Sequence, residues 1–100
     1  MSGYADRLRA HARLAILRFL DGAPQYTSNV SLLAELLPDV GITMSRDQIT
    51  TEVRWLEDQG LVHCEEHSAG FVIVEATVRG QEVAQGIAAV PGVKRPRPGD

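Results

Sequence analysis

The 100-residue sequence predicts one small domain of the α+β class that is mainly helical. Apolar residues recur at helical spacing in three segments of the first 60 residues. Two short runs, 61–66 and 71–76, flank a four-residue segment, which is the pattern of a β-hairpin. The hydrophobic fraction of 44% suffices for a single core in a chain of this length.

The first helix is predicted from Tyr4 to about Asp21, where a Gly- and Pro-containing segment turns the chain. Its apolar residues lie on one side. They are Leu8, Ala12, Ala15, Ile16, Phe19 and Leu20. The arginines are expected to form a solvated face with weak ion pairs to Asp6 and Asp21. They are Arg7, Arg9, Arg13 and Arg18.

A second, shorter helix is predicted near 29–37. Ser28 or Asn29 can cap its first turn, and Pro38 ends it. The connection that follows, residues 38–44, is longer than the turn of a minimal helix-turn-helix.

The third helix, predicted near 46–59, carries the clearest local signals. Ser45 and Gln48 stand at the spacing of a capping box, in which each side chain accepts a hydrogen bond from the other residue's backbone N–H. Gly60 can adopt the left-handed conformation that ends a helix. One apolar stripe is expected to be buried, which leaves the opposite face for a partner. The stripe consists of Ile49, Val53 and Leu56.

The hairpin at 61–76 and a last helix near 78–86, capped by Thr77, complete a domain predicted to span residues 1–90. Residues 91–100 are rich in proline and glycine, and we expect a flexible basic tail that cannot pack.

Charge is unevenly distributed along the chain. Residues 1–90 carry seven Arg against twelve Asp or Glu, whereas residues 91–100 carry three basic residues against one Asp. An acidic body weighs against nucleic-acid binding, because affinity for phosphate comes mainly from Lys and Arg displacing counterions.

The compartment is expected to be intracellular. Cys64 is the one cysteine, so no internal disulfide is possible. No signal peptide precedes Tyr4, and no apolar run approaches the ~18 residues of a membrane span. The sequence therefore predicts a soluble protein without a membrane partner.

The predicted order of elements, with 43–46 entering the third helix and 55–62 leaving it, resembles that of ArsR-like winged-helix regulators. A closer resemblance is to a family of small ArsR-like proteins of Mu-like transposable phages and prophages. It rests on residues 4–6, 13–18, 29–33, 45–47 and 90–96. The resemblance implies a winged helix-turn-helix, with three helices, a β-hairpin as the wing and a C-terminal helix, in the cytoplasm of a host cell.

The resemblance also implies a homodimer formed by the first and last helices. The residues expected in such an interface are Leu8, Ala12, Ala15, Val83 and Ala84.

The third helix offers residue types that can bond phosphates or base edges. They are Arg46, Gln48, Thr50, Thr51 and Arg54. Ser68 at the hairpin loop and the tail cations Lys94, Arg95 and Arg97 are further candidates for contact with DNA. Four acidic residues oppose this interpretation: Asp47, Glu52, Glu57 and Asp58. Trp55, beside the apolar stripe, is expected to pack against the wing.

Neither a metal site nor a catalytic site is predicted. His63, Cys64 and His67 are close in sequence, but alternation along a strand places Cys64 on the face opposite the histidines. We expect Cys64 to be a small buried hydrophobic residue and predict no cofactor. No sequence pattern places a base beside a nucleophile, so an enzyme is not expected.

Two function classes remain open. The first is a phage-encoded DNA-binding protein that acts as a regulator or as an accessory in handling phage DNA. The second is a non-enzymatic protein-interaction module whose third helix meets a phage or host protein. We favour the first.

Overall fold

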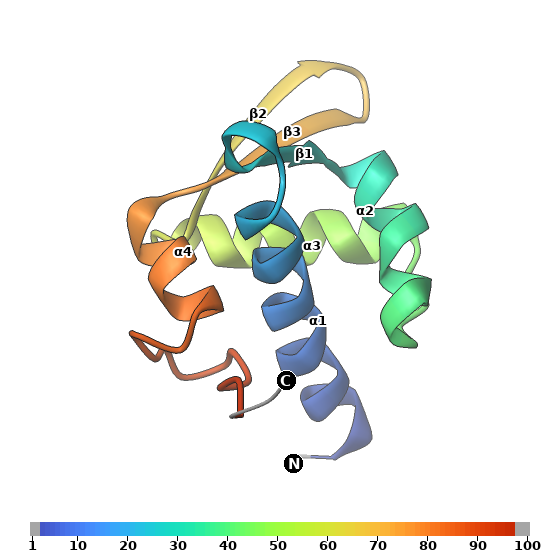
Figure 1. Cartoon of the computed structure of the whole chain (residues 1–100). Helices are drawn as coiled ribbons and strands as arrows, with labels where there is room; N and C mark the ends of the chain where they lie inside the picture. The colour runs from blue at the N-terminus through green and yellow to red at the C-terminus, as the bar shows by residue number, and fades with distance from the viewer. Residues whose placement is uncertain (1–2, 98–100) are drawn as a thin grey trace.

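The computed structural model describes residues 3–97. Over these residues the chain forms four α-helices and three strands, and Figure 1 shows their arrangement. The helices are α1 (Tyr4–Asp21), α2 (Val30–Leu36), α3 (Arg46–Asp58) and α4 (Val78–Ala84). The strands are β1 (Thr27–Asn29), β2 (Val62–Ser68) and β3 (Phe71–Ala76), and short 3-10 turns, η1 (Pro24–Tyr26) and η2 (Leu37–Val40), flank β1 and α2. The predicted α+β class, helices and hairpin are confirmed.

The strands form one antiparallel sheet in the order β1-β3-β2. Val74 at its centre pairs with Ser28 on one side and Cys64 on the other. The sequence does not predict β1, because its three polar residues have no apolar alternation. Pairing with β3, more than 40 residues later in the sequence, creates this strand.

Local capping explains where the helices begin. The Ser45 hydroxyl accepts a hydrogen bond from the Gln48 N–H at 3.1 Å, and the Gln48 amide oxygen accepts one from the Ser45 N–H at 2.8 Å. The predicted capping box is therefore confirmed. Asn29 caps α2 and Thr77 caps α4, as expected.

The core lies between the four helices and one face of the sheet. Ala12 is fully buried and Val83 and Ala84 are nearly so, and α4 packs directly on α1. The structure buries these three residues within one chain, and their role in a dimer interface stays a prediction. Leu8 and Ala15 are partly buried against the core, and their role in a dimer stays a prediction.

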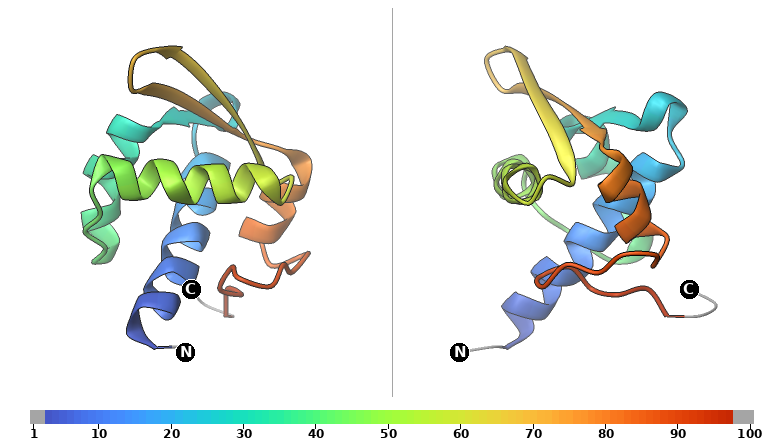
Figure 2. Two further views of the ribbon diagram at one scale, coloured as in Figure 1. Left: turned by 180° about the vertical axis from the view of Figure 1, so that it is seen from behind. Right: turned by 90° about the vertical axis from the view of Figure 1, so that its left-hand side faces the viewer.

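The segment after α4 packs on the domain, although the sequence predicts a tail that cannot pack; the flexibility of the tail stays a prediction. Val90 is buried, and the Lys94 N–H donates a hydrogen bond to the Ala10 carbonyl at 3.2 Å. Val93 lies against the core. Figure 2 shows residues 91–97 passing along α1. Residues 98–100 of the predicted tail lie outside the described residues.

Arg13 joins α1, α3 and this C-terminal segment. Its Nε donates to Oε1 of Glu52 at 2.7 Å, and its Nη1 donates to the Gly92 carbonyl at 3.0 Å. The guanidinium carbon lies 3.9 Å from the ring centre of Trp55. Two predictions were therefore wrong: Arg13 is not on a solvated face, and Trp55 packs under Arg13 and Gly92 rather than on the hairpin.

No helix within residues 3–97 is long and apolar enough to cross a membrane.

Candidate nucleic-acid interface

The outer face of α3 holds most of the predicted contact residues. Burial of Ile49, Val53 and Leu56 turns the opposite side of the helix outward, as predicted. In Figure 2 the β2–β3 hairpin runs beside this helix. The exposed or partly exposed residues on α3 include Arg46, Gln48, Thr50, Thr51 and Arg54. Arg46 and Arg54 face the hairpin, whereas Gln48 and Thr51 line a hollow against α1, so the structure divides the candidates between two sides of the helix.

The start of α3 meets the start of α2 and the turn of the hairpin. Arg46 donates through Nη2 to the Ser31 hydroxyl at 2.8 Å. A shallow hollow of about 270 Å³ lies here and is lined by Ser31, Arg46, Ala69, Gly70 and Phe71. Ser68, at the end of β2, is exposed next to this hollow. Three segments that are far apart in sequence therefore form one continuous surface.

Arg54 bridges α3 and the hairpin. Its guanidinium lies 3.3 Å from Oε1 of Glu57 on the same helix and 3.3 Å from Oε1 of Glu66 on β2. The Arg54 side chain is 41% exposed and that of Glu66 is 52% exposed. Ion pairs in such solvated positions are typically worth about 0–1 kcal/mol, so they orient Arg54 more than they immobilise it.

Glu57 fastens the hairpin to α3. Its Oε2 accepts a hydrogen bond from the Cys64 N–H at 3.0 Å. This backbone bond is the main reason that the pKa of Glu57 lies below its usual value, and Arg54 and His63 lower the pKa further. The carboxylate therefore has a structural partner on β2.

The electrostatics of the α3 face differ from the sequence interpretation. Glu52 was counted among the acidic residues of the helix, but its side chain is 4% exposed and is paired with Arg13 on the inner side. Glu57 is bound to β2 and Arg54. Asp47 and Asp58 stay exposed near the two ends of α3. The middle of the outer face is less acidic than composition alone suggests.

The C-terminal cations do not join this face. Lys94 and Arg97 lie beside α1, and Arg95 donates to the Gly86 carbonyl at 3.5 Å. Their contact with DNA stays a prediction, and it would need a surface separate from α3. Ser31, Glu66 and Phe71 were missed by sequence reasoning, because only tertiary packing brings them beside α3.

Histidines and Cys64 divide between the two sides of β2, as alternation predicted. The Cys64 thiol is buried and lies 3.6 Å from the Val53 carbonyl. His63 is exposed, and His67 lies 3.1 Å from Oε1 of Glu65. Within residues 3–97, no three His, Cys, Asp or Glu side chains are grouped so as to hold a metal ion.

Burial raises the pKa of the Cys64 thiol to about 11, and the nearby Glu57 carboxylate contributes to the rise. The ordinary value is near 9.0. The Cys64 thiol ionises at a lower pH in the unfolded chain than in the folded chain. Its contribution to the unfolding free energy is therefore complete below pH 9 and is lost as the pH rises to about 11. Between neutral pH and about pH 10.5, the unfolding free energy of the wild type should fall by about 2 kcal/mol more than that of Cys64→Ala.

Urea denaturation of both proteins at the two pH values measures this difference. The two proteins differ only at position 64, so the comparison isolates the thiol. Equal decreases in unfolding free energy for the wild type and Cys64→Ala would show that the thiol is not buried away from water.

Comparison with known proteins relates the sequence of this chain to that of a phage protein. Over 93 residues the chain is 44% identical to "Uncharacterized protein gp26" of Escherichia phage Mu, which covers 93% of this chain and 95% of that protein. The chain belongs to the gp26 family. A further relative is an uncharacterised protein of Haemophilus influenzae, 37% identical over 76 residues, which are 76% of this chain and 74% of the relative. No family model matches the gp26-like chain, and no solved structure matches it.

Proposed function

We propose that this gp26 family member is a winged-helix DNA-binding protein that regulates or helps to handle the DNA of a Mu-like phage in the cytoplasm of its host. In this proposal β2 and β3 form the wing and α3 is the recognition helix. The observation that carries it is the outer side of α3, where Arg46 and Arg54 lie beside the hairpin and Gln48 and Thr51 lie toward α1. Relationship to a phage Mu protein supports the phage context.

The shape of this face suits a duplex. An α-helix of 13 residues is about 20 Å long, and the major groove of B-DNA is wide enough to admit one. Arg46 and Ser68 lie at the end where α2 and the hairpin turn meet. In that position they can contact phosphates while Gln48, Thr51 and Arg54 approach base edges.

The ion pairs of Arg54 do not prevent such contact. Both pairs are partly exposed, so exchanging a carboxylate for a phosphate gives up little free energy. Glu66 nevertheless competes with DNA for the same guanidinium. We therefore expect the charge of Glu66 to weaken binding.

The alternative is a protein-interaction module. Its support is the occupation of Arg54 by two carboxylates, together with the further exposed acids Asp58 on α3 and Glu65 on β2. A basic protein surface would complement these charges.

A binding experiment separates the two proposals. A duplex is first selected from a random pool with the wild-type protein and compared with a scrambled duplex at two salt concentrations. Arg54→Ala should weaken binding to the selected duplex by about 1–3 kcal/mol, the scale of charge-assisted contacts to guanine or phosphate. Glu66→Gln should strengthen it by up to about 1 kcal/mol.

Glu82→Gln on α4 is the matched control, because it removes the same charge from another part of the molecule. If Glu66→Gln and Glu82→Gln change affinity equally, the effect is one of net charge alone. Absence of binding at low salt, or an Arg54→Ala protein with unaltered affinity, would contradict DNA recognition by α3 and favour the interaction module.

A further inference from the structure

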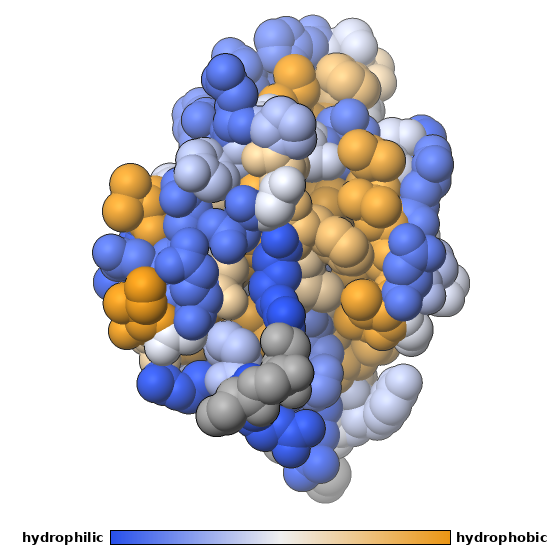
Figure 3. Space-filling view, in the orientation of Figure 1, coloured by the Kyte–Doolittle hydropathy of each residue, from blue (hydrophilic) through white to orange (hydrophobic). Residues whose placement is uncertain are grey.

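A groove runs along α1, between η2 and the C-terminal segment, on the side of the molecule seen in Figure 1. Its volume is about 510 Å³. It is lined by His11, Leu14, Ala15, Arg18, Phe19, Val40, Ile42, Lys94 and Arg97. Figure 3 shows it as an apolar strip bordered by hydrophilic residues. The outer face of α3 lies on the opposite side of the molecule (Figures 1 and 2), so the groove is not part of the proposed DNA interface.

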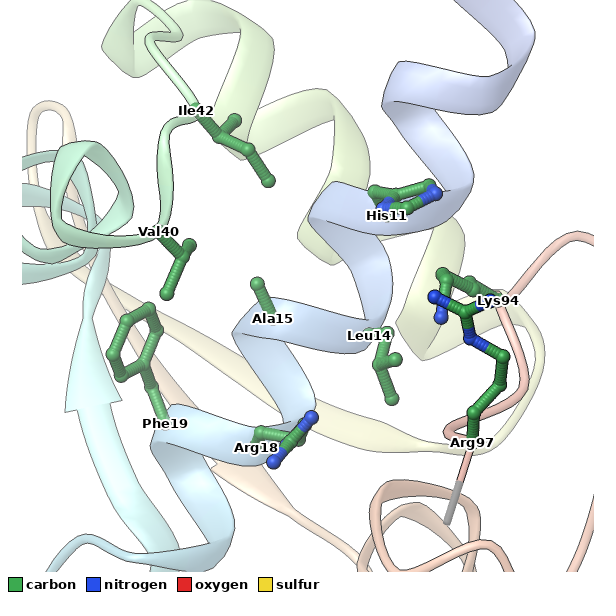
Figure 4. A pocket seen from close by; sticks show the side chains of 9 residues that line it. All are labelled: His11, Leu14, Ala15, Arg18, Phe19, Val40, Ile42, Lys94 and Arg97. Carbon is green, nitrogen blue, oxygen red and sulfur yellow. The ribbon is translucent and has the colours of Figure 1, made fainter. Parts of the chain in front are cut away.

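The two sides of the groove differ in chemistry. In Figure 4, Phe19 and Val40 stand on one side, whereas Arg18, Lys94 and Arg97 border the other. Val40 is 54% exposed. No acidic side chain of residues 3–97 lines the groove, although the whole chain has a formal charge of −3. The fold therefore concentrates positive charge beside exposed apolar surface.

Packing of the C-terminal segment creates this arrangement. The Lys94 N–H bonds to the Ala10 carbonyl, which holds the segment against α1. Lys94 and Arg97 are thereby placed along the same helix as His11 and Arg18. These four basic residues are separated by up to 86 positions in the sequence, and tertiary structure alone gathers them.

A second copy of the chain fits this groove poorly. A two-fold interface places the same patch on both partners, so the basic border would face either another basic border or the apolar side, and never an acidic side chain. Like charges opposed across an interface are destabilising. Nucleic acid would complement the charge but would leave the side formed by Phe19 and Val40 without an apolar partner.

We propose that the groove binds an acidic amphipathic helix of another protein. The apolar side of that helix packs on Phe19 and Val40, and its carboxylates face Arg18, Lys94 and Arg97. Helices that lie in grooves are commonly recognised by an apolar face in this way, while flanking charges set orientation and partner choice. The protein then carries a protein-binding surface that is separate from α3.

The test uses two fluorescein-labelled helical peptides of about 16 residues. Both have leucines along one face; one has glutamates on the flanks and the other has lysines at the same positions. Fluorescence anisotropy is measured with the full chain at two salt concentrations. The acidic peptide should bind in a salt-dependent manner, at least about tenfold more tightly than the basic peptide.

Four variants locate the binding site. Arg18→Glu and Val40→Ser should each weaken binding of the acidic peptide at least about fivefold. Arg79→Glu and Val78→Ser make the same changes at exposed positions on α4, outside the groove, and should leave binding within about twofold of wild type. Circular dichroism verifies that each variant is folded.

Three results would overturn the proposal. The first is equal binding of the two peptides or no binding of the acidic one. The second is a groove variant that binds as tightly as its α4 control. The third is a wild-type dimer in sedimentation that becomes monomeric in Val40→Ser but not in Val78→Ser, because the groove would then be a self-interface.

Discussion

Replacing Gly80 with alanine is expected to destabilise the domain by about 3 kcal/mol or more, a large part of the ~5–15 kcal/mol that typically stabilises a native domain. A Cβ at this position would lie 2.0 Å from the Leu61 carbonyl oxygen and 3.0 Å from the Leu61 carbonyl carbon. Both atoms belong to the backbone, so no rotamer change can relieve the overlap. The clash outweighs the gain in helix propensity of up to about 1 kcal/mol that alanine normally brings.

The surrounding backbone cannot move away without losing other bonds. The Leu61 carbonyl accepts a hydrogen bond from the Thr77 N–H at 3.0 Å. The Thr77 hydroxyl donates to the Gly60 carbonyl and accepts from the Gly80 N–H. Moving α4 away from β2 would break this network as well as the packing of α4 on α1.

Urea denaturation followed by circular dichroism measures the effect, with Gly22→Ala as the control. Gly22 has a φ of −91°, and a Cβ there would lie no closer than 3.7 Å to its nearest neighbour, the Arg18 carbonyl. The unfolding free energy of the Gly22→Ala protein should stay within about 1 kcal/mol of wild type. A Gly80→Ala protein as stable as wild type would contradict the close crossing of α4 over Leu61.

Arg13→Met is expected to destabilise the domain by about 3–5 kcal/mol, because it leaves Glu52 as a buried charge without its partner. The Arg13 and Glu52 side chains are 14% and 4% exposed, so water can compensate little. The substitution also removes the bond to the Gly92 carbonyl and the stacking on Trp55. The C-terminal segment should consequently be released from α3.

The double variant Arg13→Met/Glu52→Leu should recover most of this loss, because no unpaired charge remains buried. A double-mutant cycle measured by urea denaturation should therefore show strong coupling between the two positions. Arg9→Met, which removes an exposed ion pair with Asp6, is the control and should change stability by about 0.5 kcal/mol or less. Additive effects of Arg13→Met and Glu52→Leu would show that the pair is not formed in solution.

The candidate interface was predictable where neighbouring residues decide the conformation. Periodicity identified the outward face of α3, and alternation along β2 separated Cys64 from the two histidines. The partners of these residues were not predictable in the same way. Arg54 meets Glu66, and Arg46 meets Ser31, only because the hairpin and α2 pack beside α3.

The amino-acid sequence by itself determined the helices, their caps and the hairpin, because these depend on residues a few positions apart. The capping box of Ser45 and Gln48 and the stop at Gly60 are examples. Tertiary structure alone decided the existence of β1, the burial of Glu52 and the ordered course of residues 91–97. Each of these features is stabilised by partners from distant positions, and neither composition nor periodicity records which distant groups will meet.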